Sequence, residues 1–188
     1  MKSDDGLAPV SYLPGAMPPA PAPADTARRS KSTTRDVSVR ALTRRDLSRW
    51  ELEQVLRARD LDEEAVAAEI TRLEDIGLID DAALADMLVR TRHERKGLGR
   101  SALALELRRR HVAQHDIDAA LVQIDDEDER ATAVRLARDR VRRLHGLDQE
   151  TAVRRLSGYL MRKGYSSDVV RSAVREALPS HRSGVAFD

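Results

Sequence analysis

LALELRRRHVAQHDIDAAL, residues 103–121, contains the pattern that decides the fold of this chain. Leu103 and Leu107 are followed by a basic residue, Arg110, and then by apolar residues at positions 112, 117 and 121. The stretches LEQVLRARDLDEEAVAAEI (52–70) and LSGYLMRKGYSSDVVRSAV (156–174) repeat all six positions, at offsets of 51 and 53 residues. A repeat of this period indicates one supersecondary unit that is used several times.

Each copy of the pattern predicts a pair of helices. The two leucines lie four residues apart, so they share one face of a helix. Ser48 and Glu51 have the spacing of a capping box and predict that the first copy's helix begins at about residue 49. After the helix comes a position that must tolerate left-handed geometry, for which Gly164 is well suited and Asp60 and His111 less so. Asp62 and Ser166 are good N-caps for the following helix, whereas Ala113 at the same position is a weak one.

A third kind of helix is expected before each pair. Apolar residues with helical spacing predict it over about 81–96 in the second unit and about 127–145 in the third. In the first unit it would fall near 31–44, where Val37, Ala41 and Leu42 offer little apolar surface, so we expect it to be short. The prediction is an all-α protein built as an elongated tandem array of three imperfect three-helix repeats, with eight or nine helices. A compact helical bundle is the structural alternative.

The repeat also predicts how the chain divides. Six of the seven prolines lie in residues 1–35, a Pro/Ala-rich segment that we expect to be a disordered tail. The expected divisions are this tail (1–35), helical repeat 1 (36–79), helical repeat 2 (80–124), helical repeat 3 (125–179) and a C-terminal tail (180–188).

Composition narrows the class of protein. The chain has no cysteine, which excludes a disulfide framework and a thiolate metal site. Its N-terminus does not resemble a secretion signal, and no stretch is long and apolar enough to span a membrane. We therefore expect a cytoplasmic protein.

The sequence contains no recognisable catalytic or cofactor-binding constellation. His111 and His115 are four residues apart, but the expected helix break between them removes the geometry of a metal pair. Asp80 and Asp81 stand where a helix N-terminus favours acidic residues, so we expect them to cap a helix. We expect no catalytic residues, no metal site and no cofactor.

Basic residues are concentrated in particular segments although the formal net charge is only +1. Residues 81–115 carry eight Lys/Arg against four Asp/Glu, a balance suited to an acidic partner. Gly97-Leu98-Gly99 predicts a tight link that leaves the N-terminus of the next helix facing outward. With Arg95, Lys96 and Arg100 beside it, this terminus could hold a phosphate or carboxylate, and an ordinary turn is the other interpretation.

Several of these segments together resemble a known family. They are Ser48-x-x-Glu51-Leu52 with Leu56, Gly77-Leu78-Ile79-Asp80-Asp81, Arg90-x₄-Arg95-x-Gly97-x-Gly99-x₆-Glu106-Leu107, and Tyr159-Leu160-x-x-Lys163-Gly164-Tyr165. In this order they resemble RecX, the regulatory protein of the RecA recombinase, over residues 46–178. The chain departs from the family at Asp60 and His111, where the family usually has glycine, and in its weak first helix.

The resemblance implies a non-enzymatic modulator that binds in the groove of the RecA–single-stranded DNA filament. There it would restrain filament growth, ATP hydrolysis and strand exchange, and would meet the DNA through the filament. We expect such a protein to be a monomer. The family match gives these candidate contact residues: Arg90, Arg95, Lys96, Arg100, Arg108, Arg109 and Arg110. We add Arg92 from its position beside them, and Arg154, Arg155, Arg162 and Lys163 by analogy in the third unit.

Two other classes of function remain open on the sequence. An independent DNA-binding protein would need base-reading side chains on a recognition helix, and the second helix of each repeated pair is poor in them. A helical-repeat adaptor without affinity for RecA or DNA is the third class.

Overall fold

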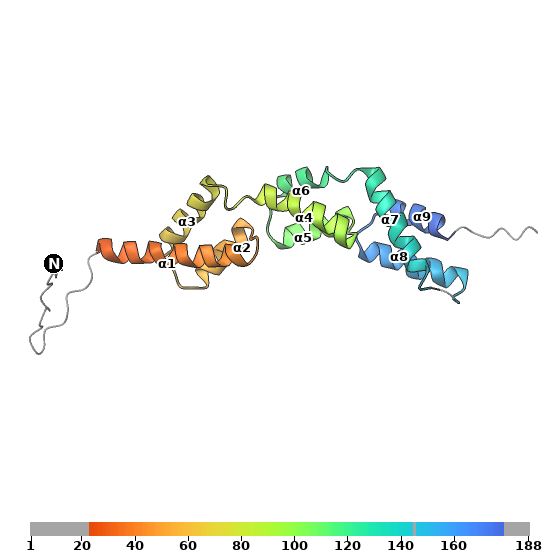
Figure 1. Cartoon of the computed structure of the whole chain (residues 1–188), viewed down its shortest axis with the longest axis horizontal. Coiled ribbons are helices and arrows are strands. Elements are labelled where there is room, and N and C mark those ends of the chain that lie inside the picture. Colours follow the sequence, from red (N-terminus) through yellow and green to blue (C-terminus); the bar gives the residue numbers. More distant parts are fainter. Residues whose placement is uncertain (1–22, 145, 179–188) are drawn as a thin grey trace, which may run out of the picture.

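The computed structural model describes residues 23–144 and 146–178, with side chains from residue 33 onward. All regular structure in these residues is helical, which confirms the all-α prediction. The helices are α1 (Pro23–Arg44), α2 (Arg49–Arg57), α3 (Glu63–Asp75), α4 (Asp81–Lys96), α5 (Arg100–Arg109), α6 (Gln114–Leu121), α7 (Asp126–Val141), α8 (Gln149–Arg162) and α9 (Ser167–Ala177). They form a long rod with α1 at one end and α7 to α9 at the other (Figure 1).

The rod contains three separate hydrophobic clusters, and each is built by three consecutive helices. Helices α1 to α3 (unit 1) enclose the first, α4 to α6 (unit 2) the second, and α7 to α9 (unit 3) the third. The paired leucines of the repeat, such as Leu52 with Leu56 and Leu103 with Leu107, are fully buried. Each buried leucine side chain stabilises its unit by about 1.5–3 kcal/mol. The repeated apolar positions therefore form the cores, as the sequence predicts.

The helix boundaries follow from the capping residues. Ser48 and Glu51 form both halves of the capping box at the start of α2. Asp62 and Ser166 accept hydrogen bonds from the first turns of α3 and α9, whereas Ala113 leaves α6 without a side-chain cap. After α2, α5 and α8 the chain turns through left-handed residues, with φ of 51° at Asp60, 58° at His111 and 88° at Gly164.

Two helix predictions are wrong. The structure has a 22-residue helix, α1, where the sequence suggested a tail to residue 35 and a short helix beyond it. Val37, Ala41 and Leu42 do pack on the first core, and the buried Ser38 adds a polar contact by donating a 2.6 Å hydrogen bond to Glu69. The other error is α7, which ends at Val141 rather than near 145. Our predictions for residues 1–22 and 180–188 lie outside the described residues.

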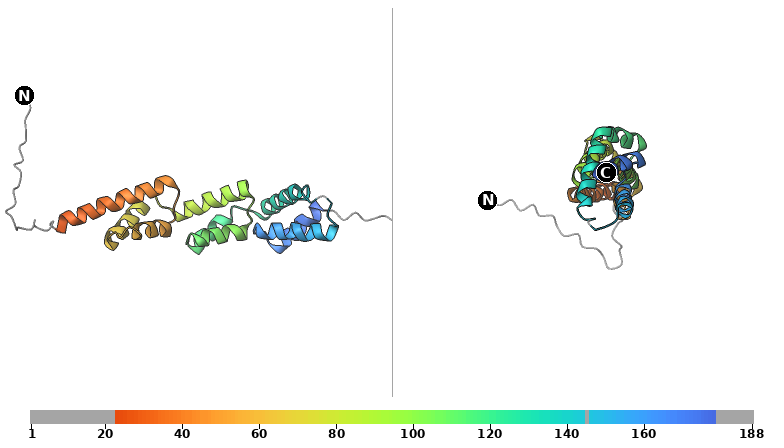
Figure 2. Two further views of the ribbon diagram at one scale, coloured as in Figure 1. Left: turned by 90° about the horizontal axis from the view of Figure 1, so that it is seen from below. Right: turned by 90° about the vertical axis from the view of Figure 1, so that its right-hand side faces the viewer.

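Helices α2, α5 and α8 follow one another end to end along the rod. The C-terminal end of α5 meets the N-terminal end of α2, where Ser48 Oγ donates to the Arg110 carbonyl oxygen over 2.6 Å. The C-terminal end of α8 meets the N-terminal end of α5 in the same way, with Gly99 N donating to the Lys163 carbonyl oxygen over 2.8 Å. Figure 2 shows α5 and α8 along one side of the rod. We call this row of three helices the second-helix line.

Candidate interaction surface

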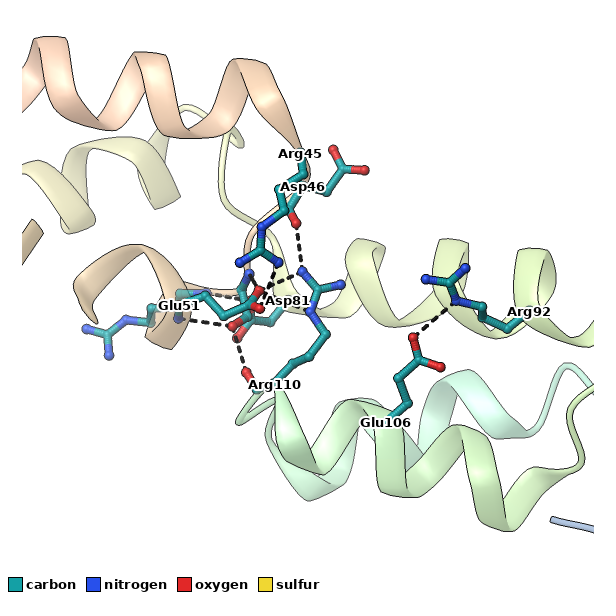
Figure 3. A network of polar contacts seen from close by, with 9 residues as sticks. Arg45, Asp46, Glu51, Asp81, Arg92, Glu106 and Arg110 are labelled. Carbon is teal, nitrogen blue, oxygen red and sulfur yellow. Dashed lines mark hydrogen bonds and ion pairs between the residues drawn. The ribbon is translucent and has the colours of Figure 1, made fainter. Parts of the chain in front are cut away.

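Arg110 joins unit 2 to unit 1. Its guanidinium donates to Glu51 Oε2 over 2.6 and 3.0 Å and to the Asp46 carbonyl oxygen over 2.7 Å (Figure 3). The side chains of Arg110 and Glu51 are only 16% and 15% exposed. Trp50 and His111 stack at the same joint, with ring centroids 3.7 Å apart. Charged hydrogen bonds with this little solvent access stabilise a contact more than surface ion pairs do.

Lys163 joins unit 3 to unit 2 from the same position of the repeat. Its Nζ donates to the Lys96 carbonyl oxygen over 2.6 Å, and the buried Tyr165 hydroxyl donates to the Gly97 carbonyl oxygen over 3.1 Å. The backbones approach so closely here that a Cβ atom on Gly164 would lie 2.4 Å from Ala102 N. Burial raises the pKa of Tyr165, so its hydroxyl keeps its proton and remains a donor.

The basic position of the repeat therefore has a role that differs from helix capping. Arg110 and Lys163 each reach into the preceding unit, where they bond Glu51 and the Lys96 carbonyl oxygen. Arg59, the same position in unit 1, is exposed to solvent. The apolar positions of the repeat thus form the core within each unit, and its basic position in units 2 and 3 contacts the preceding unit.

The N-terminus of α5 is covered by unit 3, so the prediction that it faces outward is wrong, and of the two interpretations the site for an external anion is lost. Arg100 N donates to Glu129 Oε1 over 3.0 Å, and Glu129 is itself buried. The Arg100 side chain bonds Asp126 over 2.6 Å and also donates to the Ile124 carbonyl oxygen. A carboxylate of this chain already occupies the place that an external anion would take.

Two other candidate residues have partners within unit 2. Arg92 donates to Glu106 over 3.1 Å, as Figure 3 shows. Arg108 donates to Gln114 over 3.1 Å, although it remains exposed.

The remaining seven candidates are exposed, and none forms an ion pair within the described part of the chain. They lie on the second half of α4, at the end of α5 and along α8: Arg90, Arg95, Lys96, Arg109, Arg154, Arg155 and Arg162. Since α5 and α8 belong to the second-helix line, four of these residues lie on one continuous row of helices. We call the seven residues the exposed basic set.

The sequence analysis did not identify a row of arginines along α7 and its C-cap residue. Arg135, Arg138 and Arg142, at positions i, i+3 and i+7, line a groove of about 530 Å³, where Arg138 pairs with Glu176 over 2.8 Å. Their spacing places them on one side of a helix. The sequence alone did not show that this side of α7 stays outside the third core.

The surroundings of two carboxyl groups at the first joint shift their pKa values in opposite directions. Burial opposes ionisation of Glu51, but hydrogen bonds from Arg110, Ser48 and Arg45 outweigh it and lower the pKa of Glu51. Burial raises the pKa of Asp81, despite the 2.8 Å hydrogen bond from Arg49 N. The ionised form of Glu51 therefore stabilises the joint, whereas the ionised form of Asp81 destabilises it.

Within the described residues, no three His, Cys, Asp or Glu side chains are grouped as metal ligands. The same residues include no helix that is both long and apolar enough to cross a bilayer.

These features define a class, the elongated proteins built from tandem three-helix domains. Family models described as the second and third three-helix domains of RecX match residues 80–121 and 126–174. The Regulatory protein RecX of Streptomyces coelicolor is 42% identical over 77% of this chain and 77% of its own length. That of Thermobifida fusca is 39% identical over 81% of this chain and 83% of its own length.

Solved structures show the same fold. RecX from Lactobacillus salivarius superimposes with a TM-score of 0.74 at 23% identity, covering 80% of this chain and 97% of that one. A second structure, of a regulatory protein RecX, gives a TM-score of 0.71 at 26% identity over 79% of this chain and 73% of that one. The chain belongs to the RecX family and is a regulator of that type.

Proposed function

We propose that this protein regulates the RecA recombinase by binding along the RecA–single-stranded DNA filament. It restrains filament growth, ATP hydrolysis and strand exchange and catalyses no reaction of its own. Membership in the RecX family supports this function. The structural observation that carries it is the exposed basic set on a rod whose helices follow one another end to end.

The form of the rod suits a long partner. Each unit shares its hydrophobic core only among its own three helices, so the array extends in one direction and offers a long surface. Exposed arginines without ion pairs are available to phosphates and carboxylates of a nucleoprotein surface. Binding through them should weaken as salt concentration rises.

The contacts between units limit which basic residues can bind the filament. Arg100, Arg110 and Lys163 hold the units together, so the proposed contact residues are the exposed basic set, with Arg92 and Arg108 as partly engaged neighbours. Arg154, Arg155 and Arg162 extend the surface to unit 3, where α8 continues the second-helix line.

ATP hydrolysis by RecA on single-stranded DNA tests the proposed function. The full chain should slow hydrolysis at a molar ratio to RecA well below one, since one protein that obstructs a growing filament affects many subunits. Unchanged hydrolysis in the presence of saturating protein would exclude this function.

Pull-down experiments separate the filament from its components. The chain should be retained by preformed RecA filaments more strongly than by free RecA or by bare single-stranded DNA. Equal retention on bare DNA would instead favour an independent DNA-binding protein, and no retention on any of the three would favour an adaptor.

A further inference from the structure

A groove opens on the joint between units 1 and 2, where α1 ends and α4 begins. Its volume is about 340 Å³, at the lower end of the roughly 300–1,000 Å³ that ligand pockets span. The end of α1 with the link to α2, the link from α3 to α4, and the first two turns of α4 form its three sides. Apart from two aspartates, the lining residues are apolar or glycine: Leu42, Leu47, Gly77, Leu78, Ala83, Leu84 and Met87.

Leu78 brings an exposed apolar side chain to this groove. It is 58% exposed and follows Gly77, whose φ of 67° turns the chain after α3. The next residue, Ile79, is buried in the first core, so the core is filled without Leu78. Leu42 and Met87, which are partly buried, extend the apolar surface of the groove. Contiguous exposed apolar surface on a folded protein is typical of interaction sites.

The joint between units 2 and 3 shows that the repeat does not require this apolar lining. The sequence Ile-Asp-Asp at the start of α4 (79–81) recurs at the start of α7 (124–126), and a groove lies at this second joint as well. At the positions of Leu78, Ala83 and Met87, the second groove is lined by Gln123, Asp128 and Thr132. The fold thus forms such a joint with polar residues at these three positions. An apolar ligand accounts for their replacement at the first joint.

The charge around the first groove is negative. Among the described residues, the charged groups that line it are Asp46 and Asp80. The Asp80 carboxylate accepts a 2.9 Å hydrogen bond from Ala83 N, and the Asp46 carboxylate points away from Arg110 (Figure 3). Neither aspartate forms an ion pair within the described part of the chain, and the adjacent Arg45 donates to Glu51 over 3.0 Å. A cationic group beside an apolar one therefore complements this surface.

We propose that this groove binds a segment of a protein partner that inserts a leucine or methionine side chain and carries lysine or arginine next to it. The apolar side chain packs on Leu42, Leu78 and Met87, and the cationic neighbours face Asp46 and Asp80. Burial of apolar surface supplies the affinity, and the two carboxylates select the charge of the segment. No residue of the exposed basic set lines the groove, so the proposal stands independently of the proposed function.

Methionine-methyl NMR of the full chain tests the site. Met87 lines the groove, whereas Met161 is 54% exposed on α8 and serves as the internal control. Met87→Leu identifies the Met87 signal. The probe is the peptide acetyl-Lys-Leu-Leu-Lys-amide, which should shift the Met87 signal in a saturable manner and leave the Met161 signal unchanged. An unmoved Met87 signal, or an equal shift of Met161, would overturn the proposal.

Two reference peptides separate the apolar contribution from the charged one. Glutamate in place of both lysines should weaken binding, because its carboxylates would face Asp46 and Asp80. Alanine in place of both leucines should weaken binding, because less apolar surface is buried. A reference peptide that binds as tightly as the probe would contradict the chemistry assigned to the groove.

Variants with matched controls complete the test. Leu78→Ser should weaken binding of the probe by about three- to tenfold, since it removes apolar contact. Ile76→Ser is its control, because Ile76 is 56% exposed and does not line the groove. Asp46→Asn should weaken binding by up to about fivefold, the range for one exposed ion pair, with Asp75→Asn at the exposed end of α3 as its control. Equal effects of either substitution and its control would overturn the proposal.

Discussion

Gly164 sets the distance between units 2 and 3. Its φ of 88° lies in the left-handed region, and the Ala102 backbone occupies the space where a Cβ atom would stand. Gly146 has a similar φ of 82°, but a Cβ atom there would have no neighbour within 4 Å. The two glycines thus separate the effect of backbone conformation from the effect of close packing.

Gly164→Ala should lower the free energy of unfolding by about 2–4 kcal/mol, because left-handed strain adds to overpacking at the joint. Gly146→Ala should lower it by only about 1 kcal/mol, from strain alone. Urea unfolding followed by circular dichroism measures both values. Equal losses in the two variants would contradict the close approach of Gly164 to Ala102.

Glu51 should make the first joint sensitive to acid. Its pKa in the folded protein lies below the ordinary 4.5, so its stabilising effect is complete above that value and is lost as the pH falls through the folded pKa. Glu51→Gln should therefore cost about 1–2 kcal/mol at about pH 7, and this cost should shrink as the pH falls below 4.5 through the folded pKa.

Thermal unfolding of both proteins over this pH range measures the difference. Asp81 has a raised pKa and changes stability in the opposite direction on acidification, but it is present in both proteins and cancels in the comparison. A difference that stays constant with pH would show that the charge of Glu51 does not stabilise the joint.

Single residues were predicted well where their role is local. The caps at Ser48 and Asp62 and the left-handed position at Gly164 follow from residue type and spacing. The partners of Arg110 and Lys163 did not follow, because Glu51 and Lys96 lie 59 and 67 residues away in the sequence. No periodicity connects residues so far apart, so only the three-dimensional arrangement reveals that the basic position joins two units.

Helix α6 begins without a side-chain cap. Ala113 has the extended conformation of an N-cap, with φ of −63° and ψ of 145°, but no side-chain acceptor. The corresponding residue of unit 1, Asp62, accepts a 2.9 Å hydrogen bond from Ala65 N.

Ala113→Ser should stabilise the protein by about 0.5–2 kcal/mol, because its hydroxyl can accept from an amide of the first turn, as the Asp62 carboxylate does in α3. Asp62→Ala should destabilise by a similar amount, since it removes that kind of bond from α3. Chemical unfolding of both variants measures the changes. A loss of stability in Ala113→Ser would show that the start of α6 has no room for a cap.

The elements themselves could be predicted from the sequence, with one large exception. Apolar spacing predicted the helices of units 2 and 3, because each buries a regular stripe of side chains. It failed for α1, where the buried positions include Thr34 and Ser38. The hydrogen bond from Ser38 to Glu69, which also bonds Arg72, takes the place of apolar contact in this part of the helix.

Across the whole rod, the two joints are built differently. Unit 1 meets unit 2 chiefly through side chains, the Arg110–Glu51 pair and the Trp50–His111 stack. Units 2 and 3 also meet through side chains, but their backbones pack closely as well, at Gly99 and Gly164. At this second joint, a Cβ atom on Gly99 or Gly164 would lie within 2.6 Å of backbone atoms of the neighbouring unit. All seven residues of the exposed basic set lie on units 2 and 3.

Co-sedimentation with preformed RecA–single-stranded DNA filaments tests the central claim most directly. A variant that reverses Arg95 and Lys96 to Glu should bind filaments at least about tenfold more weakly, since each lost contact costs about 1 kcal/mol and each new acid repels phosphate. A variant that reverses Arg171 and Arg175, exposed residues of α9 outside the set, changes the net charge equally and should bind almost as well as the unaltered chain. Equal weakening by both variants, or by neither, would contradict the assignment of filament binding to the exposed basic set.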